Sequence, residues 1–510
     1  MGTISRLIIS LLFVIAMAWY VNITFGHLPN AGFLILATVF GAYMAMNIGA
    51  NDAANNVGPL VGSGAVTLGG AILIAFIFEF LGAFIAGGDV VGTIKDGIVS
   101  QDAFGGNRMI FVYAMSASLL AGAIWLNIAT YIKAPVSTTH SIVGGVIGAG
   151  IVAGGFAVVS WAKVGSIVAS WIISPILGGI FAALFLLFIK KTVIYKENQL
   201  DAAKKIVPLL ISFMVTLFIT YLIYKGVKNI WSNIVAIFSF LPQEKKPSLF
   251  IALLIGLFAG VGSYFYVKPK FEQKISNSSG ELRANINTFF NIPLIFSAAL
   301  LSFAHGSNDR ANAIGPLAAV NDAITNMTIS VEASLPLWVT LVGALGLSVG
   351  LTLFGAKLIK LVGSEITDLD QIRVFAITVA SGFVVLLASE LGMPVSSTHI
   401  AIGAVFGVGF MREWLGSKQQ IGEEKQELHI EIEKHDDLKL KLENCDESDY
   451  KTRLELTNQI KQQKKIVKKL KKALRDQYVK TEMIKKIITS WVVTVPISAI
   501  LGAIIFLVIK

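Results

Sequence analysis

Charged residues are scarce in this chain: Asp, Glu, Lys and Arg make up 15% of its 510 residues. Hydrophobic residues make up 55%, and the mean hydropathy is +0.71. An ordinary soluble domain carries about 25% charged residues, so this composition excludes a soluble globular protein and indicates a membrane protein. Cysteine is nearly absent. The single Cys445 has no partner in the chain, which excludes an intrachain disulfide and a thiolate metal site.

Sequence signatures of enzymes are also missing. The chain has no Walker phosphate-binding loop, no His-Glu-x-x-His zinc motif and no Gly-x-Ser-x-Gly nucleophile elbow. We therefore expect no enzymatic activity and no cofactor. The net charge of +10 does not indicate nucleic-acid binding, because an excess of Lys and Arg in a membrane protein marks its cytoplasmic loops.

Long apolar runs occupy most of the chain. A run of about 20 residues crosses the hydrocarbon core as a helix, and the sequence predicts about twelve such spans. The first run follows Arg6 and has no small-residue cleavage site after it, so we expect an uncleaved span rather than a signal peptide. The candidate ranges are 5–25, 32–54, 65–88, 109–131, 135–155, 161–189, 206–225, 248–267, 290–312, 335–356, 373–391, 394–411 and 487–509.

Two polar motifs occur twice, in the same order. The run GANDAANNVGP at 49–59 is echoed by GSNDRANAIGP at 306–316, an offset of 257 residues (306 − 49). The run PVSTTH at 135–140 is echoed by PVSSTH at 394–399, an offset of 259 residues (394 − 135). Two unrelated motifs at nearly one offset indicate an internal duplication. Glycines follow the second motif at matching places: Gly144, Gly148 and Gly150 against Gly403, Gly407 and Gly409.

A charged insertion interrupts the second half of the duplication. Ser170-Trp171 is echoed by Ser490-Trp491 at an offset of 320 residues (491 − 171), so about sixty residues were inserted after the second PVSSTH motif. The stretch 412–486 is rich in Lys and Glu, and a turn-like segment lies at 446–448. We predict a soluble cytoplasmic helical hairpin, which is either a solvated appendage or a surface for a partner. Its apolar residues at helical spacing include Leu438 with Leu442 and Ile466 with Leu470.

The basic residues predict that the two halves have opposite orientations. If the Lys-rich insertion is cytoplasmic, the span 394–411 runs inward and the last span leaves the C-terminus outside. The counterpart 135–155 is followed by a loop without basic residues until Lys163, which suits the outside. Inverted repeats with a binding site near the membrane midplane are typical of secondary transporters. One segment disagrees: 225–247 should be external, yet it contains Lys225, Lys228, Lys245 and Lys246.

The first motif places carboxylates and amides inside apolar spans. A carboxylate there is costly and usually faces a cation, a cavity or a partner. Oxygen ligands of this kind, with carbonyls freed by an unwound turn at Gly49, Gly58 and Pro59, suit a hard cation such as sodium. The alternative is structural, with Asp capping a restarted helix and Asn satisfying broken backbone. The candidate sodium ligands are Asn51, Asp52, Asn55, Asn308, Asp309 and Asn312.

The second motif places hydroxyl groups directly after a proline. Proline cannot continue a helix but is favoured at the first position of a new one, so each copy predicts the N-terminus of a broken or re-entrant helix. Free N–H groups, the positive end of the helix dipole and hydroxyl donors favour an anion there. The alternative is hydroxyl capping and close packing of small residues. The candidate phosphate ligands are Ser137, Thr138, Thr139, Ser396, Ser397 and Thr398.

Four titratable residues near the motifs are candidates for coupling. His140 and His399 either donate to the anion, take part in proton coupling or orient the hydroxyl groups. Glu79 and Glu390 are each a ligand of the coupling ion or an interface residue. Glu390 lies four residues before Pro394, close to the predicted helix break.

Two residues of the second half have no equivalent in the first. His305 corresponds to Ile48, and Arg310 corresponds to Ala53. Arg310 lies beside an intramembrane acid, and it either compensates Asp309 or helps to hold the anion.

With these motifs the chain resembles the inorganic phosphate transporter (PiT) family of sodium- or proton-coupled symporters. The likeness covers both membrane halves, from about residue 32 to 411 and again 487–509. The resemblance implies ion sites at Asp52, Asn55, Asp309 and Asn312 and a phosphate site at the two hydroxyl-rich helix starts. It also implies an important glutamate at Glu79 and a membrane dimer or larger oligomer.

Three features depart from the family pattern. The first span, 5–25, is additional; the charged hairpin lies within the second half instead of joining the halves; and Arg310 is a bulky charge in the second signature. Some members of the family carry sulfate or metal phosphate.

The sequence therefore predicts an all-α polytopic protein of the plasma membrane with two inverted-topology repeats, a cytoplasmic N-terminus and an external C-terminus. We expect it to import phosphate with sodium by alternating access, because sodium offsets the charge of phosphate in low dielectric. The alternatives are a proton-coupled phosphate or sulfate permease of the same fold, or a channel or receptor-like protein that works through its hairpin. Paired helix breaks in mid-span argue against the receptor.

The predicted organisation has six segments. They are an extra N-terminal transmembrane helix (1–31), repeat 1 (32–190), a central linker with two transmembrane helices (191–289), the first part of repeat 2 (290–411), the cytoplasmic hairpin (412–486) and the last helix of repeat 2 (487–510). The expected partners are phosphate, sodium, the lipid bilayer and a second copy of the chain.

Overall fold

The computed structural model describes the chain except for residues 1, 100–103, 105–106, 133, 135, 229–230, 239–241, 243, 245, 277–281, 326–334, 366–369, 420–422, 447–448 and 479–480. Pro135, Lys245 and part of the predicted turn at 446–448 therefore lie outside the described residues. The chain divides into two compact units, Met1–Gly407 with Ile487–Lys510, and Val408–Lys486.

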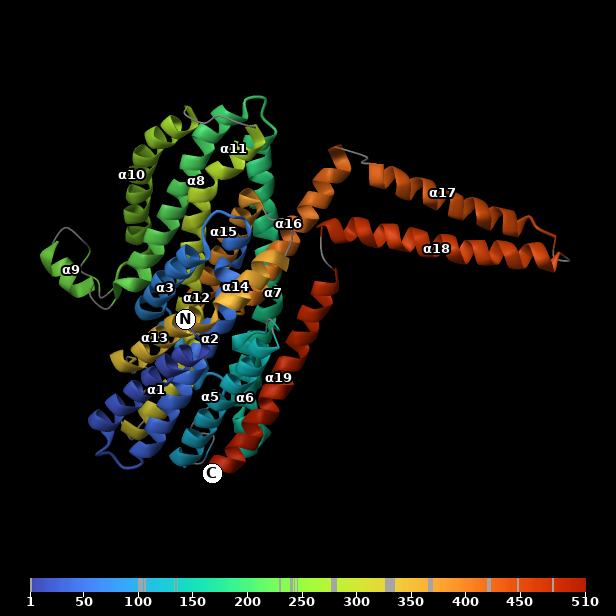
Figure 1. Ribbon diagram of the computed structural model, residues 1–510. Coiled ribbons are helices and arrows are strands. Elements are labelled where there is room, and N and C mark those ends of the chain that lie inside the picture. The colour runs from blue at the N-terminus through green and yellow to red at the C-terminus, as the bar shows by residue number, and fades with distance from the viewer. Residues whose placement is uncertain are drawn as a thin grey trace. The chain divides into compact units, whose positions relative to one another are not determined.

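The described residues are almost entirely helical, apart from connecting segments and one bridge between Val99 and Val159. Short π-helical turns follow α7 and α8, at Lys190–Ile194 and Leu222–Gly226. The helices in Figure 1 are α1 (Thr3–Phe25), α2 (Ala31–Gly62), α3 (Leu68–Ile85), α4 (Gly88–Asp96), α5 (Arg108–Tyr131), α6 (Thr138–Gly154), α7 (Trp161–Ile189), α8 (Gln199–Tyr221), α9 (Trp231–Ile237), α10 (Leu249–Ser276), α11 (Leu282–Phe289), α12 (Asn291–Thr325), α13 (Leu337–Phe354), α14 (Ala356–Glu365), α15 (Gln371–Glu390), α16 (Ser397–Gln419), α17 (Glu423–Glu443), α18 (Tyr450–Tyr478) and α19 (Thr481–Ile509).

Every apolar range predicted from the sequence coincides with a helix, which confirms the all-α fold. Among the described residues, 10 helices are long and apolar enough to cross a membrane. The other predicted ranges hold α6, which has 17 residues, and α12 and α16, in which polar residues interrupt the apolar run. Four helices were not predicted from the sequence, since each is too short to appear as an apolar run of about 20 residues: α4, α9, α11 and α14.

The first motif does not break its helix, so the expected unwound turn is wrong. α2 continues through 49–59 and α12 through 306–316, with Pro59 and Pro316 inside the helices. Neighbouring helices hold both segments, and packed membrane helices tolerate an internal proline. Each proline nevertheless lacks the N–H that would bond the carbonyl four residues earlier, which belongs to Asn55 or Asn312. The motif thus frees two carbonyl oxygens while the helix stays continuous.

The second motif begins a new helix in each half, as predicted. α5 ends at Tyr131 and α15 at Glu390, and α6 and α16 begin after short non-helical connections. The Ser137 hydroxyl accepts a hydrogen bond from the His140 N–H at 3.2 Å, and the Ser396 hydroxyl accepts one from the His399 N–H at 3.3 Å. Both serines therefore cap half-helix N-termini. The 17 residues of α6 extend about 25 Å, less than a full crossing of the hydrocarbon core.

Glycines of the first motif let α2 and α12 pack tightly against α13 and α3. A Cβ atom added at Gly49 would overlap the Leu347 carbonyl of α13, and one added at Gly306 would overlap the Glu79 carbonyl of α3. The two contacts are equivalent, with offsets of 257 residues (306 − 49) and 268 residues (347 − 79). Small residues at helix crossings are the usual means of close packing in membranes. The pairing makes Glu79 the counterpart of Leu347.

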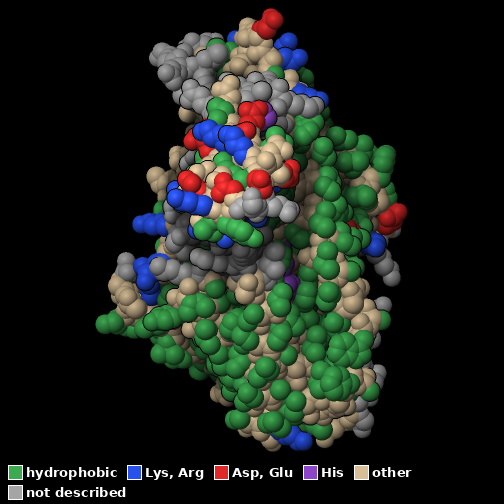
Figure 2. Space-filling view, turned by 90° about the vertical axis from the view of Figure 1, so that its right-hand side faces the viewer, with side chains coloured by type: hydrophobic (Ala, Val, Ile, Leu, Met, Phe, Trp, Pro, Cys, Tyr) green, Lys and Arg blue, Asp and Glu red, His purple; other side chains and the backbone are tan. Residues whose placement is uncertain are grey.

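A wide hydrophobic surface covers the first unit where α7 and α19 lie (Figure 2). α7 exposes Ile172, Ile176 and Ile180, and α19 exposes Ile500 and Ile504. A contiguous apolar surface of this extent indicates contact with lipid or with another membrane-embedded surface.

The second unit contains the predicted helical hairpin, formed by α17 and α18. Gln463 of α18 donates hydrogen bonds to the Glu431 carboxylate at 2.5 Å and to the Glu431 carbonyl at 3.0 Å. The hydrogen bonds from Lys434 and Gln463 lower the pKa of Glu431. These contacts join the two helices of the hairpin.

Candidate functional site

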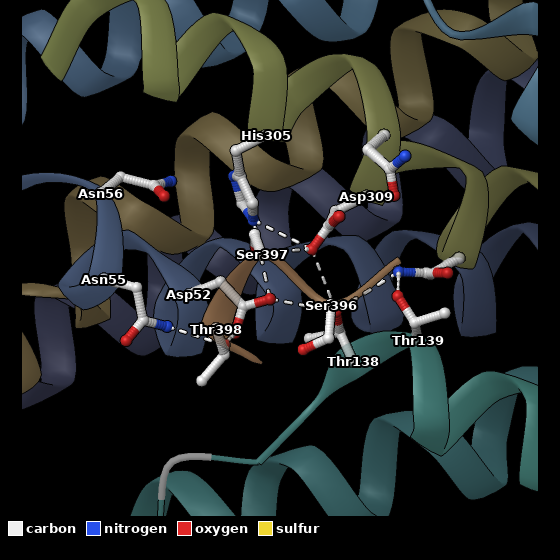
Figure 3. A network of polar contacts seen from close by, with 12 residues as sticks. Asp52, Asn55, Asn56, Thr138, Thr139, His305, Asp309, Ser396, Ser397 and Thr398 are labelled. Carbon is white, nitrogen blue, oxygen red and sulfur yellow. Dashed lines mark hydrogen bonds and ion pairs between the residues drawn. The ribbon is translucent and has the colours of Figure 1, made fainter. Parts of the chain in front are cut away.

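Two aspartates from the two copies of the first motif meet at the start of α6 (Figure 3). The Thr138 hydroxyl oxygen lies 3.0 Å from Asp52 Oδ2 and 3.2 Å from Asp309 Oδ2. Ser397, in the first turn of α16, lies 3.3 Å from the same oxygen of Asp309. Asp52 is 1% exposed and Asp309 is 0% exposed. The structure thus brings the acidic residues of the first motif to the hydroxyl residues of the second.

The motif asparagines bond across the two halves. Asn55 donates a hydrogen bond to the Thr398 hydroxyl at 2.8 Å. Asn312 donates to the Thr139 hydroxyl at 3.2 Å and to the Thr138 hydroxyl at 3.3 Å. Because Thr398 is the counterpart of Thr139, the asparagine of each half holds a hydroxyl group of the other half. Reciprocal contacts of this kind are expected if the repeats are related by a two-fold axis.

A second pair of contacts joins the first-motif helices to the ends of α5 and α15. The Asn51 side chain donates to the Thr130 hydroxyl at 3.0 Å, and the Asn308 side chain donates to the Ser389 hydroxyl at 3.0 Å. Thr130 and Ser389 are related by the same offset of 259 residues (389 − 130) as the second motif. Asn308 also accepts the Val395 N–H at 3.3 Å. These asparagines therefore brace the segments that lead into the half-helices.

His305 lies among three carboxylates, and sequence analysis assigned it no role. Its Nε2 atom is 3.2 Å from Asp309 Oδ2 and 3.6 Å from Asp52 Oδ2, and its Nδ1 atom is 3.2 Å from Glu79 Oε1. Asn56 donates to the same Glu79 oxygen at 2.8 Å. One sequence signal pointed to His305: it is four residues before Asp309, so the two side chains share one face of α12.

The central acids form a site that suits a cation. Asp52, His305 and Asp309 offer ligand atoms that all lie within 4.8 Å of one another. In the described part of the chain, no Lys or Arg forms an ion pair with Asp52, Asp309 or Glu79. Three buried carboxylates that share one imidazole and pair with none of the described Lys or Arg residues are costly, so cations would stabilise this arrangement.

Arg310 is held away from the central acids. Its guanidinium donates a hydrogen bond to the Ala83 carbonyl, near the end of α3, and the residue is buried. A cation at a helix C-terminus is stabilised by the helix dipole. Among the described ion pairs none joins Arg310 to Asp309, which argues against the first of the two roles considered for Arg310, compensation of Asp309.

His140 and His399 lie in an aromatic cluster. The ring centroid of His140 is 3.7 Å from that of Trp171, and the His399 centroid is 3.6 Å from that of Trp491. The two histidine rings are 4.5 Å apart. Their nitrogen atoms form no hydrogen bond with a described carboxylate or hydroxyl group. Only the backbone N–H groups of His140 and His399 reach a hydroxyl group, those of Ser137 and Ser396, so the ring contacts do not select among the three roles considered from the sequence.

Glu390 belongs to a separate ion-pair cluster. Its Oε2 atom is 3.0 Å from Lys225 Nζ, which also lies 2.7 Å from Asp89 Oδ2. Lys225 therefore pairs with two acids, which offers a structural reason for one of the basic residues in the segment that disagreed with the predicted orientation. Of the two glutamates singled out from the sequence, Glu79 is the one that reaches the central acids.

A helical, multi-pass bundle whose buried acids face the N-termini of α6 and α16 has the construction of a membrane transport protein. The chain belongs to the phosphate transporter family, whose sequence model matches residues 48–502. It is therefore a transport protein of the membrane and not an enzyme.

Individual relatives agree with this assignment. A Helicobacter pylori protein named "Putative phosphate permease" is 46% identical over 519 residues, which cover 98% of this chain and 94% of that protein. A Haemophilus influenzae protein of the same name is 38% identical over 378 residues, covering 74% of this chain and 87% of that protein. A solved structure named "The sodium-dependent phosphate transporter" matches with a TM-score of 0.74 and 30% identity, over 94% of this chain and 99% of that one.

Proposed function

We propose that this chain is a secondary active symporter that imports inorganic phosphate together with sodium by alternating access. The observation that carries the proposal is the Thr138 hydroxyl, which lies 3.0 Å from Asp52 and 3.2 Å from Asp309. The two acids suit a cation, and the N-terminus of α6 suits an anion. They lie side by side, so one site could hold both ions. Sodium and phosphate bound side by side offset each other's charge, which lowers the cost of bringing either ion into low dielectric.

We assign sodium binding to the two copies of the first motif. The Oδ1 atoms of Asn51, Asp309 and Asn312 accept no hydrogen bond from a described group, so they are available to an ion. The carbonyl oxygens of Asn55 and Asn312 add neutral ligands of the kind that hard cations prefer. The full set is Asn51, Asp52, Asn55, Asn308, Asp309 and Asn312.

We assign phosphate binding to the N-termini of α6 and α16. The unpaired N–H groups in the first turn of each helix and the adjacent hydroxyl groups favour a tetrahedral oxyanion. Thr138 and Ser397 reach the central acids, whereas Ser137 and Ser396 cap the helices and shape the site. Thr139 and Thr398 complete the set through their bonds to the motif asparagines.

Four further residues take part in coupling in this proposal. Glu79 acts through its contact with His305, at 3.2 Å. Glu390 acts through its ion pair with Lys225, and His140 and His399 act through the backbone N–H groups that donate to the capping serines at 3.2 and 3.3 Å. A proton-coupled permease for phosphate or sulfate is the second candidate function. It is favoured by His305, an imidazole between carboxylates and therefore a natural carrier of a proton.

We also propose that the halves are inverted repeats and that the predicted six segments describe the chain. The equivalent pairs Asn51–Thr130 and Asn308–Ser389 support a two-fold relation between the halves. In this arrangement the protein spans the plasma membrane as a homodimer, with the N-terminus in the cytoplasm and the C-terminus outside.

Uptake of labelled phosphate into proteoliposomes of the purified protein tests the function. We expect an imposed sodium gradient to drive uptake that excess sulfate leaves unchanged. Uptake driven by a proton gradient alone, or uptake blocked by sulfate, would support the second candidate instead. Absence of uptake under both gradients, with correctly folded protein, would contradict both.

Replacing Thr138 by Ala should raise the KM for phosphate and for sodium by about tenfold each, because the hydroxyl contacts both acids and one lost charge-assisted hydrogen bond is worth about 1.5 kcal/mol. Thr138→Ser keeps the hydroxyl and should stay within about twofold of the unaltered protein. The measurement is initial uptake rate against each ion. Equal kinetics in Thr138→Ala and Thr138→Ser would remove Thr138 from the site.

Deleting most of the hairpin separates the transporter from the receptor-like alternative. Replacing residues 415–485 by a flexible linker should leave sodium-driven uptake within about twofold, since Val408–Lys486 forms its own compact unit. Size-exclusion chromatography provides the folding control. Loss of uptake by a well-folded deletion variant would show that the hairpin takes part in transport.

A further inference from the structure

A cavity of about 770 Å³ lies outside the central acids, among α1, α2, α5 and α14. Figure 1 shows α1, α2 and α5 running close together. Three basic side chains line this cavity: Arg6 from α1, and Lys357 and Lys360 from α14. No Asp or Glu is among the described residues that line it. The cavity therefore has a positive lining.

The cavity borders the first copy of the first motif, because Ala50 lines it. Asn47, Ala50 and Thr130 line it, and Thr130 accepts the 3.0 Å hydrogen bond from Asn51, the residue before Asp52. A second contact, from the Asn127 side chain to the Asn47 side chain at 3.2 Å, lies one helical turn away. The Asn51–Thr130 contact thus joins the wall of the cavity to the residue that precedes Asp52.

Two positions equivalent to lining residues carry acids in the other half. Lys357 corresponds to Asp89 by the 268-residue offset of the close helix contacts, and Tyr131 corresponds to Glu390 by the 259-residue offset of the second motif. Lys225 lies 2.7 Å from Asp89 and 3.0 Å from Glu390, so a lysine from the central linker forms ion pairs with both acids. One end of the duplicated structure is therefore tied by ion pairs, and the other holds a positively lined cavity.

We infer that this cavity is the vestibule in which the central site exchanges phosphate with one aqueous compartment, and that Arg6, Lys357 and Lys360 hold the ion weakly there. The inference rests on the proposed function, in that phosphate is the ion. A cleft lined by one sign of charge with low-dielectric walls raises the local concentration of the opposite ion about 10- to 1,000-fold. Three exposed or half-buried cations attract phosphate without binding it tightly enough to stop its passage.

A positively lined cavity could also hold a second kind of phosphate group, the headgroup of an anionic phospholipid. A groove of about 450 Å³ shares Leu7, Ser10, Tyr43 and Met46 with the cavity and continues along apolar side chains of α1 and α2. An acyl chain fits such a groove. The Asn51–Thr130 contact at the cavity wall favours free phosphate, and the lipid is distinguished from it by experiment.

Thiol labelling tests the vestibule without relying on transport. The chain has one cysteine, so Cys445→Ser gives a cysteine-free background. Tyr131→Cys then places a thiol in the cavity, at a position that is 85% exposed. In phosphatidylcholine nanodiscs, we expect a sulfonate-bearing thiosulfonate reagent to react about tenfold faster than its trimethylammonium analogue, after normalisation to a free thiol.

Neutralising the two lysines of α14 should remove the preference of the Tyr131→Cys thiol for the sulfonate reagent. Lys357→Gln with Lys360→Gln should bring the two normalised rates within about twofold of each other. Replacing Lys204, a half-buried lysine of α8, by Gln should leave the preference for the sulfonate reagent unchanged. Leu391→Cys, near the other end of the duplication and 66% exposed, should show no response to the α14 substitutions. Equal rates for both reagents in the unaltered lysine background would overturn the inference.

Protection identifies the ion. Inorganic phosphate should slow labelling of Tyr131→Cys in phosphatidylcholine nanodiscs, and chloride at the same ionic strength should not. If phosphatidylglycerol protects in the absence of phosphate and inorganic phosphate does not protect, the cavity is a lipid site and the vestibule is wrong. If labelling and protection behave as expected while sodium-driven uptake is absent, the proposed function fails and the anion cavity stands.

Discussion

Asp52→Asn should abolish sodium-driven phosphate uptake, lowering its initial rate at least about 100-fold. The amide keeps the shape of the side chain and its contact with Thr138, but it removes the negative charge that would hold a cation in a fully buried site. A loss of about 3 kcal/mol in cation binding accounts for a change of this size, because every 1.4 kcal/mol is a factor of ten. The measurement is labelled phosphate uptake into proteoliposomes across a series of sodium concentrations.

Asp201→Asn is the matched control for this substitution. Asp201 lies on α8, is partly exposed, and pairs with Lys204 at 3.0 Å, so its neutralisation should change uptake by less than about twofold. Asp309→Asn should behave like Asp52→Asn, since both carboxylates contact the Thr138 hydroxyl. If either central variant transports with the sodium dependence of the unaltered protein, its carboxylate does not bind the coupling ion.

Gly49→Ala should prevent most of the protein from folding. The new methyl group would overlap the backbone carbonyl of Leu347, and α2 and α13 would have to separate along their length. Overpacking against backbone costs about 3 kcal/mol or more, because no side chain can rotate away to relieve it. Heating followed by fluorescence-detected size-exclusion chromatography should show a sharply reduced monodisperse peak, and Gly306→Ala, its counterpart on α12, should show the same.

Gly69→Ala provides the comparison. Gly69 lies in the first turn of α3, and nothing lies within 4 Å of an added Cβ atom there. Alanine is favoured over glycine in a helix by about 1 kcal/mol, so this variant should be as stable as the unaltered protein or slightly more stable. If Gly49→Ala and Gly69→Ala reduce the monodisperse peak equally, the loss of a glycine, and not the α2–α13 contact, limits folding.

Alternating access requires the contacts at the two ends to open in turn. At one end the contacts are Asn308–Ser389 and the ion pairs of Lys225 with Asp89 and Glu390. At the other end the equivalent asparagine contact, Asn51–Thr130, borders the positively lined cavity. The two ends differ in charge although they descend from one repeat, so the barriers to opening them need not be equal.

Much of the fold was predictable because its signals are local. Runs of apolar residues identify spans, since the bilayer demands a helix wherever the backbone crosses it. The helix starts at Thr138 and Ser397 were predictable because a proline followed by hydroxyl residues favours a new N-terminus in any context. The expected unwound turn at Pro59 was wrong, since whether a proline breaks a membrane helix depends on the neighbouring helices that hold it.

The sequence by itself determined that the chain is a helical membrane protein with a duplicated set of acidic and hydroxyl residues. Composition, repeats and helix starts are properties of the chain, and they do not depend on which elements later meet. Only the tertiary structure decided which side chains contact each other. The contacts are Asn55 with Thr398, His305 with Glu79, and Lys225 with Asp89 and Glu390. These partners are separated by 136 to 343 residues (225 − 89 and 398 − 55), and packing alone brings them together.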